Sequence, residues 1–218
     1  TLEKIHIKPF STLVLKNVCI IDKDPVKDPC DSEAPQVDTF FRAGYIIARF
    51  SLEGLFKQEG FHLDKAVVRN AQMNLVLEDN PTGTCRRDSS TENLSRIFKI
   101  QKKEPIQQPG EKEIFHIRRV EIDDMGFSMK NYKDEKTPYH GGINWNDLDI
   151  KDIDINVREL QFKGGIMSGI AESISFREKT GYEVERISGE ARVGRGKTIV
   201  NDLHIKDLWS DLDLSLFM

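Results

Sequence analysis

The segment from Gly194 to Thr198, Gly-Arg-Gly-Lys-Thr, is the part of the sequence most similar to a phosphate-binding loop. The full pattern requires a further glycine at position 191, where this chain has Ala191. Such a loop must also open a helix, so that the amides of the helix N-terminus face the phosphates. The residues that follow, Ile199 to Leu203, alternate as in a strand. The segment therefore predicts a glycine-rich β-turn rather than a nucleotide site.

Four aspartates between residues 147 and 154 are spaced closely enough to suggest a calcium loop. An EF-hand loop needs a central glycine and a final glutamate, and neither stands in register here. The carboxylates interleave with apolar residues, so we expect them on the solvent face of a strand and predict no metal site. The aspartates are Asp147, Asp149, Asp152 and Asp154, and the interleaved residues are Leu148, Ile150, Ile153 and Ile155.

The histidines do not form a recognisable ligand set. Four of them lie between two apolar strand residues, which predicts that they point to the opposite face, and no pair has the spacing of zinc ligands. The chain has no G-x-S-x-G nucleophile motif either. We therefore expect no catalytic residues, no metal, no cofactor and no enzymatic activity. The five histidines are His6, His62, His116, His140 and His204, and all but His140 are flanked in this way.

Charge, cysteine content and hydropathy restrict the possible partners, disulfides and membrane-spanning segments. The 32 Lys and Arg against 36 Asp and Glu give a net charge of -4 with mixed signs along the chain, which argues against a nucleic-acid partner. Cys19, Cys30 and Cys85 show no C-x-x-C spacing. Their odd number leaves at least one thiol outside any disulfide, and the spacing does not decide whether two of them pair. No apolar run approaches the roughly 20 residues that a membrane-spanning helix needs.

Period-two alternation is the dominant pattern and predicts a mainly β protein. Two short helices are expected, at residues 52–58 after Ser51 and at residues 92–99 after Thr91. Proline, glycine and charged residues predict loop insertions near residues 22–38, 80–90, 101–112 and 133–142. We find no linker between domains and expect one segment, 1–218. The chain starts at Thr1 without methionine and ends within an alternating run, so we expect a fragment of a larger protein.

A spacing of apolar residues recurs along the chain. Within each recurring set, the apolar residues switch twice between odd-numbered and even-numbered positions, which we call a change of parity. Each change requires a bulge or tight turn, because it would otherwise move the apolar side chains to the other face of the strand. The recurrence predicts an elongated, antiparallel sheet built from repeats, although any β protein shows some recurring alternation. The three sets are Phe61, Leu63, Ala66, Val68, Met73 and Leu75; Phe115, Ile117, Val120, Ile122, Phe127 and Met129; and Leu148, Ile150, Ile153, Ile155, Leu160 and Phe162.

Three stretches, taken together, resemble the amino-terminal part of TamB-like proteins, the translocation and assembly module group related to AsmA. The first is Ile5 to Val18, ending at Ile20-Ile-Asp22. The second is Asn144 to Ile150, continuing to Leu160. The third is Ile174 to Tyr182, followed by Ile187-Ser188. The resemblance covers most of the chain apart from the loop insertions.

The resemblance implies a long periplasmic protein anchored to the inner membrane through a region absent from this sequence. It also implies a curved, groove-like β-sheet with an apolar interior, and a role in outer-membrane biogenesis and in phospholipid transport between the membranes. The expected partners are phospholipid acyl chains and outer-membrane assembly proteins. The candidate groove-lining residues are Met73, Leu75, Leu77, Phe127, Met129, Ile153, Ile155 and Val157.

Three alternatives remain open at this point. The same apolar residues can pack as a closed sandwich core. The chain can act as a scaffold that binds outer-membrane assembly partners by β-augmentation, without conducting lipid. A carbohydrate-binding or enzymatic β-domain would need an exposed aromatic platform or a carboxylate pair in a cleft. For the platform the sequence offers only Trp145 and Trp209.

Overall fold

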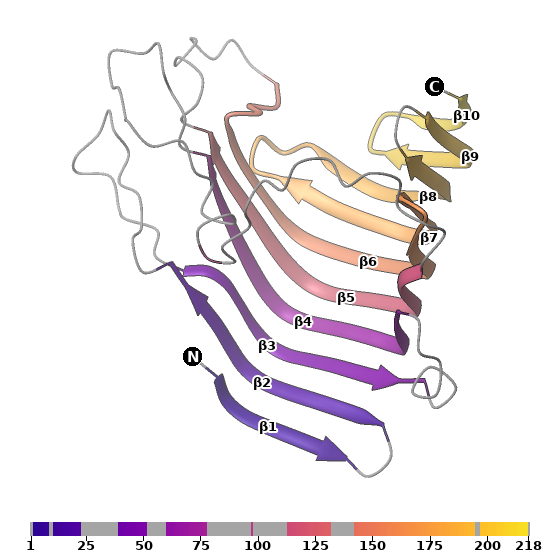
Figure 1. Ribbon diagram of the computed structural model, residues 1–218. Coiled ribbons are helices and arrows are strands. Elements are labelled where there is room, and N and C mark those ends of the chain that lie inside the picture. Colours follow the sequence, from indigo (N-terminus) through magenta and orange to yellow (C-terminus); the bar gives the residue numbers. More distant parts are fainter. Residues whose placement is uncertain are drawn as a thin grey trace, which may run out of the picture.

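The computed structural model consists of ten β-strands that form one sheet (Figure 1). It describes residues 2–8, 11–22, 39–51, 60–77, 97, 113–131, 142–194 and 197–217. The strands are β1 Leu2–Lys8, β2 Thr12–Ile21, β3 Thr39–Phe50, β4 Phe61–Leu77, β5 Glu113–Asn131, β6 Asp147–Lys163, β7 Ile166–Glu178, β8 Glu183–Gly194, β9 Lys197–Asp207 and β10 Asp211–Phe217. The prediction of a mainly β protein is confirmed.

The strands lie side by side in the order in which they occur in the chain, and the sheet is not closed. Neighbouring strands are antiparallel at every junction but one. At that junction β4 and β5 run parallel, so the expectation of a wholly antiparallel sheet is wrong there. Parallel neighbours need a crossover connection of a dozen or more residues. Residues 78–112, which separate the two strands, provide that length.

In the parallel register of β4 and β5, residues at equivalent positions of the first two recurring sets lie side by side. Phe61 lies beside Phe115, and Met73 lies beside Phe127. The side chains of His62 and His116 are also neighbours, with ring centroids 6.1 Å apart and planes at 87°. The first two recurring sets are therefore aligned residue by residue along the two strands.

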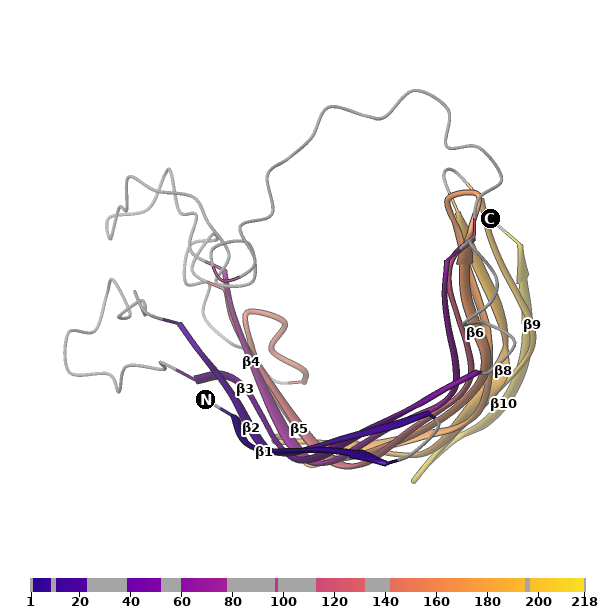
Figure 2. The same cartoon turned by 60° about the horizontal axis from the view of Figure 1, so that its bottom comes forward.

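The long strands bend part-way along their length (Figure 2). The second change of parity in each of the first two sets coincides with a residue that has left-handed backbone geometry: Asn70 lies between Val68 and Met73, and Asp124 lies between Ile122 and Phe127. Such residues break the regular pleat and turn the strand. Six non-glycine residues of the described ranges have this geometry, with φ between 49° and 56°, and all six are exposed: Asn17, Asn70, Asp124, Asp152, Glu159 and Asp202.

Few side chains are fully buried, because every described strand belongs to the same sheet. The buried apolar residues in the described part are Phe40, Ala43, Leu63, Val67, Ala71, Val76, Leu148, Ile153 and Val184. Most other apolar side chains are half-buried. In a single sheet of this kind, much of the apolar surface stays accessible to solvent or to a bound molecule.

Several sequence predictions lie outside the described residues. The expected helix at 52–58 is one of them, and the expected helix at 92–99 is described only at Ile97, whose backbone is helical. The four loop insertions also lie outside, apart from Asp22 and Gly142 at their ends. Cys19 is half-buried in β2, whereas Cys30 and Cys85 are not described. The segment after Gly196 is a strand, as predicted.

Candidate functional site: the apolar face of the sheet

A row of directly paired aliphatic residues crosses all ten strands. Register partners on neighbouring strands point to the same side of a sheet, so one pair can be followed to the next without a break. We call this set the aliphatic row and the side that carries it the apolar face. The row consists of Ile5, Leu15, Ile46, Val68, Ile122, Ile155, Ile174, Ile187, Ile205 and Leu212.

Further apolar rows run beside it on the same face. At the bend, paired residues Ala43, Ala71, Met125 and Ile153 form one row. Beyond the bend, Phe41, Met73, Phe127 and Ile150 form another. Towards the opposite end of the strands, Phe50, Leu63, Ile117 and Leu160 form a third. The apolar face is therefore continuous along the strands as well as across them.

All eight residues predicted to line a groove lie on the apolar face. Met73 pairs with Phe127, and Leu75 pairs with Met129. Leu77 continues the alternation of β4. On β6, Ile153, Ile155 and Val157 pair with Met125, Ile122 and Val120 of β5. Ile153 is buried and the other seven are half-buried.

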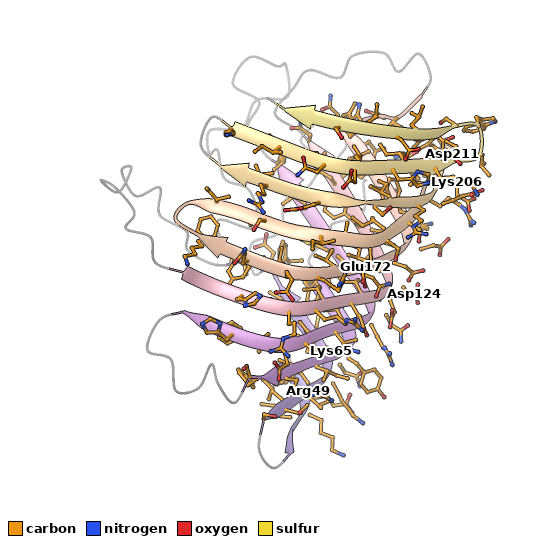
Figure 3. The ribbon with its side chains drawn as sticks, turned by 90° about the vertical axis from the view of Figure 1, so that its right-hand side faces the viewer. Arg49, Lys65, Asp124, Glu172, Lys206 and Asp211 are labelled. Atoms are coloured by element: carbon orange, nitrogen blue, oxygen red, sulfur yellow. The ribbon has the colours of Figure 1, made fainter. Side chains whose placement is uncertain are left out.

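The opposite side, which we call the charged face, carries charged side chains from strands across the sheet (Figure 3), and several of them form cross-strand ion pairs. Lys65 Nζ lies 2.7 Å from Glu121 Oε2, and Lys206 Nζ lies 2.6 Å from Glu185 Oε2. Exposed pairs of this kind contribute at most about 1 kcal/mol each. They make this face largely polar, although it also carries the paired apolar residues Val14, Ile47 and Val67. The labelled residues Arg49, Lys65, Asp124, Glu172, Lys206 and Asp211 come from β3, β4, β5, β7, β9 and β10.

The aspartates and the side chains of His62, His116 and His204 belong to the charged face, as their spacing predicts; the side chains of His6 and His140 lie outside the described part. Asp149 pairs with Ser128, and His116 Nε2 lies 2.7 Å from Glu159 Oε2, with which it forms an ion pair when protonated. His204 contacts Asp213 in the same way, at 2.9 Å. Among the described residues, no group of three His, Cys, Asp or Glu side chains is arranged to hold a metal ion.

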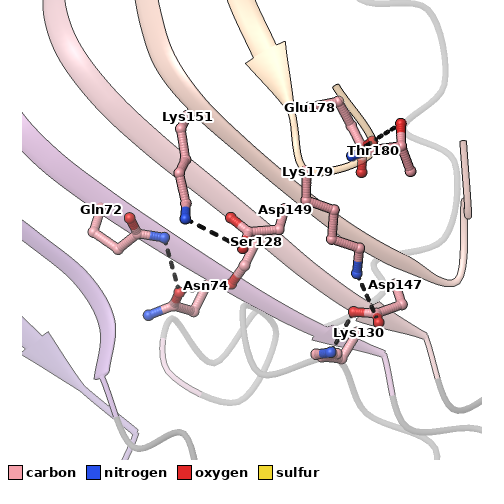
Figure 4. Close-up of polar contacts among 10 residues, drawn as sticks. All are labelled: Gln72, Asn74, Ser128, Lys130, Asp147, Asp149, Lys151, Glu178, Lys179 and Thr180. Carbon is pink, nitrogen blue, oxygen red and sulfur yellow. Dashed lines mark hydrogen bonds and ion pairs between the residues drawn. The ribbon is translucent and has the colours of Figure 1, made fainter. Parts of the chain in front are cut away.

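A buried carboxylate interrupts the apolar face at the end of β7. Glu178 pairs with Ile150 at the end of β7, and only 2% of its surface is exposed. Its Oε2 accepts hydrogen bonds from the backbone amide of Thr180, at 2.7 Å, and from the Thr180 hydroxyl (Figure 4). Burial opposes ionisation, but the Thr180 bonds and the nearby charge of Lys179 together outweigh it, so the pKa of Glu178 is lowered. Its Oε1 is buried and has no hydrogen-bond partner among the described residues.

Beside it, on the charged face, Asp147 links two strands and a turn. Its carboxylate contacts Lys130 of β5 and lies 2.7 Å from Nζ of Lys179, in the turn after β7 (Figure 4). Partial burial opposes ionisation of Asp147, but the two lysines more than compensate and lower its pKa. The contacts tie the start of β6 to both neighbours.

The same end of the sheet carries an aromatic pair. Tyr182, between β7 and β8, stacks on Trp209, between β9 and β10, with ring centroids 6.4 Å apart and planes at 21°. The Tyr182 hydroxyl donates to Asp207 Oδ2 at 3.1 Å. Burial together with this aspartate raises the pKa of the Tyr182 phenol, which keeps its proton. The ring of Trp209 is held in place although 76% of the residue is exposed.

Sequence reasoning missed Glu178 and the Tyr182–Trp209 pair. Glu178 continues the alternation of Ile174 and Phe176, and this signal could have placed it on the apolar face. Nothing in the spacing signals the aromatic pair, since its members lie on different turns. Trp209 had been considered only as one part of a sugar-binding platform.

These features define the molecule, over its described part, as an open single-layer β-sheet protein with one apolar and one charged face. No described helix is long and apolar enough to cross a membrane. No family model matches the chain, and neither a curated protein nor a solved structure is significantly similar to it. The two faces of the sheet are therefore the basis for a proposed function.

Proposed function

We propose that the chain is a non-enzymatic segment of a TamB/AsmA-like envelope protein whose apolar face lines an open groove for phospholipid acyl chains. In the complete protein the groove carries phospholipid between the inner and outer membranes and so contributes to outer-membrane biogenesis. That protein is periplasmic and anchored to the inner membrane through a region outside this chain. The aliphatic row, unbroken from Ile5 to Leu212, is the observation that carries the proposal.

The energetics of an uncovered face support a lipid occupant. Removal of apolar surface from water contributes about 25 cal/mol per Å², and contiguous exposed apolar patches mark binding surfaces. Ile5 is 56% exposed, Phe61 48% and Leu214 49%, all on the apolar face. A sealed sandwich core, the alternative, requires a second sheet opposite this face. All ten described strands instead belong to one sheet.

The bend supports the assignment of the apolar face to the concave side. At the bend, side chains on the inside of the curve approach one another and those on the outside diverge. Ala43 and Ala71 of the apolar face are only 3% and 6% exposed there. Asn70 and Asp124, at the same height, are exposed. The curvature visible in Figure 2 therefore fits a groove with an apolar interior.

The in-register pairing of β4 and β5 supports a sheet built from repeats. Residues at equivalent positions of two units lie side by side, from Phe61 and Phe115 to Leu75 and Met129. Each strand mainly contacts its neighbours, which is the behaviour of repeat proteins. A groove made in this way has the same cross-section along its length, which suits the passage of an acyl chain.

Site-specific photo-cross-linking tests the proposal. A photoreactive amino acid replaces Ile155 on the apolar face and, in the control variant, the adjacent half-buried Asn156 on the charged face. After irradiation in cells, adducts are identified by mass spectrometry. We expect phospholipid adducts at Ile155 and not at Asn156. Equal yields at the two positions, or none at Ile155, would refute the groove.

A second candidate function is a scaffold that binds outer-membrane assembly proteins by β-augmentation. It is favoured by the position of β1 and β10, which each pair on one side only within the described sheet. Edge strands present unpaired backbone groups to other chains. Cross-linking from Ile5, on β1, to a strand of an outer-membrane assembly protein supports this function. Failure of the Ile155 lipid adduct together with an Ile5 protein adduct would favour it over the groove.

A further inference from the structure

At one end of the sheet, the apolar face ends beside the aromatic pair Tyr182 and Trp209. Val184, 2% exposed, pairs with Phe176 and with Asp207 on either side, and the turns that hold Tyr182 and Trp209 follow directly. The backbone amide of Glu178 donates to the carbonyl of Tyr182 at 2.8 Å. This contact places Tyr182 beside the buried end of β7, where the apolar face meets the solvent.

The exposed ring of Trp209 is held by a rigid turn. Asp207 Oδ1 accepts from the backbone amides of Trp209 and Ser210, at 2.8 and 2.7 Å. The amide of Asp207 donates to the carbonyl of Ser210 at 2.9 Å. With the Tyr182 hydroxyl on Oδ2, a single carboxylate fixes both aromatic residues. Such pre-organisation reduces the entropy lost when a ligand contacts the ring.

The second tryptophan lies at the same end of the sheet. Trp145, 69% exposed, precedes β6, and Ile150 near the start of β6 pairs with Glu178 at the end of β7. The chain has only two tryptophans. Both are therefore exposed in turns along one margin of the sheet, together with Tyr182. We call these three residues the aromatic rim.

We propose that the aromatic rim holds the glycerol and carbonyl region of a phospholipid whose acyl chains lie on the apolar face. This proposal rests on the proposed function and assigns the orientation of its ligand. Tryptophan and tyrosine favour the boundary between hydrocarbon and water, because each has an apolar ring and a polar hydrogen-bonding group. Here the boundary is the end of the apolar face, and the headgroup projects beyond it into solvent.

Fluorescence quenching tests this orientation. The Trp145→Phe variant keeps Trp209 as its single tryptophan. It is loaded with phosphatidylcholine brominated near either the carboxyl end or the methyl end of one acyl chain, and the bound lipid is measured separately by native mass spectrometry. Bromine quenches by contact, so we expect carboxyl-end bromine to quench Trp209 at least about twofold more strongly. The Trp209→Phe variant reports on Trp145 in the same way.

The outcomes separate the two proposals. Equal quenching by the two lipids, stronger quenching from the methyl end, or bound lipid without quenching would overturn the aromatic rim and leave the groove intact. Trp209 fluorescence that responds to a soluble oligosaccharide and not to bound lipid would likewise overturn it, in favour of a sugar platform. The absence of bound lipid in any form of the protein would instead count against the groove.

Discussion

Asn70 of β4 lies beside Asp124 of β5, and both have left-handed backbone geometry, with φ of 49° and 56°. The flanking pairs, Arg69 with Asp123 and Ala71 with Met125, fix this alignment. Two adjacent strands thus turn at the same height. Asparagine and aspartate tolerate this conformation better than other non-glycine residues. The bend is therefore encoded by residue type at particular positions.

Replacement of Asp124 tests whether the bend depends on that preference. A β-branched side chain is strained at positive φ, so we expect Asp124→Val to lower the free energy of unfolding by about 1–2 kcal/mol. Asp124→Gly removes the side chain without strain and is expected to be nearly neutral. Urea unfolding followed by circular dichroism measures both variants. Equal losses in the two would show that the aspartate side chain, rather than the backbone conformation, matters.

We predict that any side chain at Gly189 of β8 destabilises the fold, because of the backbone conformation and the close contacts at this position. Its φ is 148°, and a Cβ atom there would approach the carbonyl oxygens of Asn201 and Asp202 to 3.1 Å. We expect Gly189→Ala to reduce the free energy of unfolding by about 1–3 kcal/mol. Gly44→Ala is the matched control, because its Cβ would make ordinary contacts of 3.5 Å or more. If Gly44→Ala proves as damaging as Gly189→Ala, the close backbone approach is not the cause.

The buried Glu178 predicts a pH dependence of stability. Its pKa is lowered in the folded protein from an ordinary value of 4.5. The ionised form is thus favoured by folding, and the stabilisation is present above pH 4.5 and is lost as the pH falls through the folded pKa. Thr180→Val removes one donor to this carboxylate and is expected to cost about 1–2 kcal/mol at neutral pH.

The test is the difference in unfolding free energy between wild type and Thr180→Val, measured across the acidic range. We expect the difference to shrink as Glu178 becomes protonated. Glu183→Gln, which alters an exposed ion pair with Arg177, serves as the control for general electrostatic effects. A difference that stays constant down to low pH would mean that Thr180 acts through packing and not through the carboxylate.

The alternation of the sequence predicted a mainly β protein, but it did not identify residues 39–50, which form β3. The spacing that equated Phe61 with Phe115 and Met73 with Phe127 matches the register between β4 and β5. The changes of parity predicted between Val68 and Met73 and between Ile122 and Phe127 span Asn70 and Asp124, whose backbone is left-handed. These features are local, because the direction of a side chain depends on its position in its own strand.

Features that depend on other parts of the chain were not predicted. Alternation is the same for parallel and antiparallel strands, so it could not reveal that β4 and β5 are parallel. The burial of Glu178 depends on the turn that folds Thr180 back onto it. The contact between Tyr182 and Trp209 depends on two turns brought together by β8 and β9. Sequence spacing carries no direct record of such contacts.

Native mass spectrometry of gently purified protein tests the central claim most directly, namely that the apolar face binds acyl chains. The protein is measured as isolated and after incubation with dispersed phospholipid, alongside the Ile155→Asp variant and its neighbour control Asn156→Asp. We predict phospholipid adducts on wild type and on Asn156→Asp, and their loss from folded Ile155→Asp. Folded wild-type protein that carries no lipid as isolated and takes up none on incubation would contradict the account.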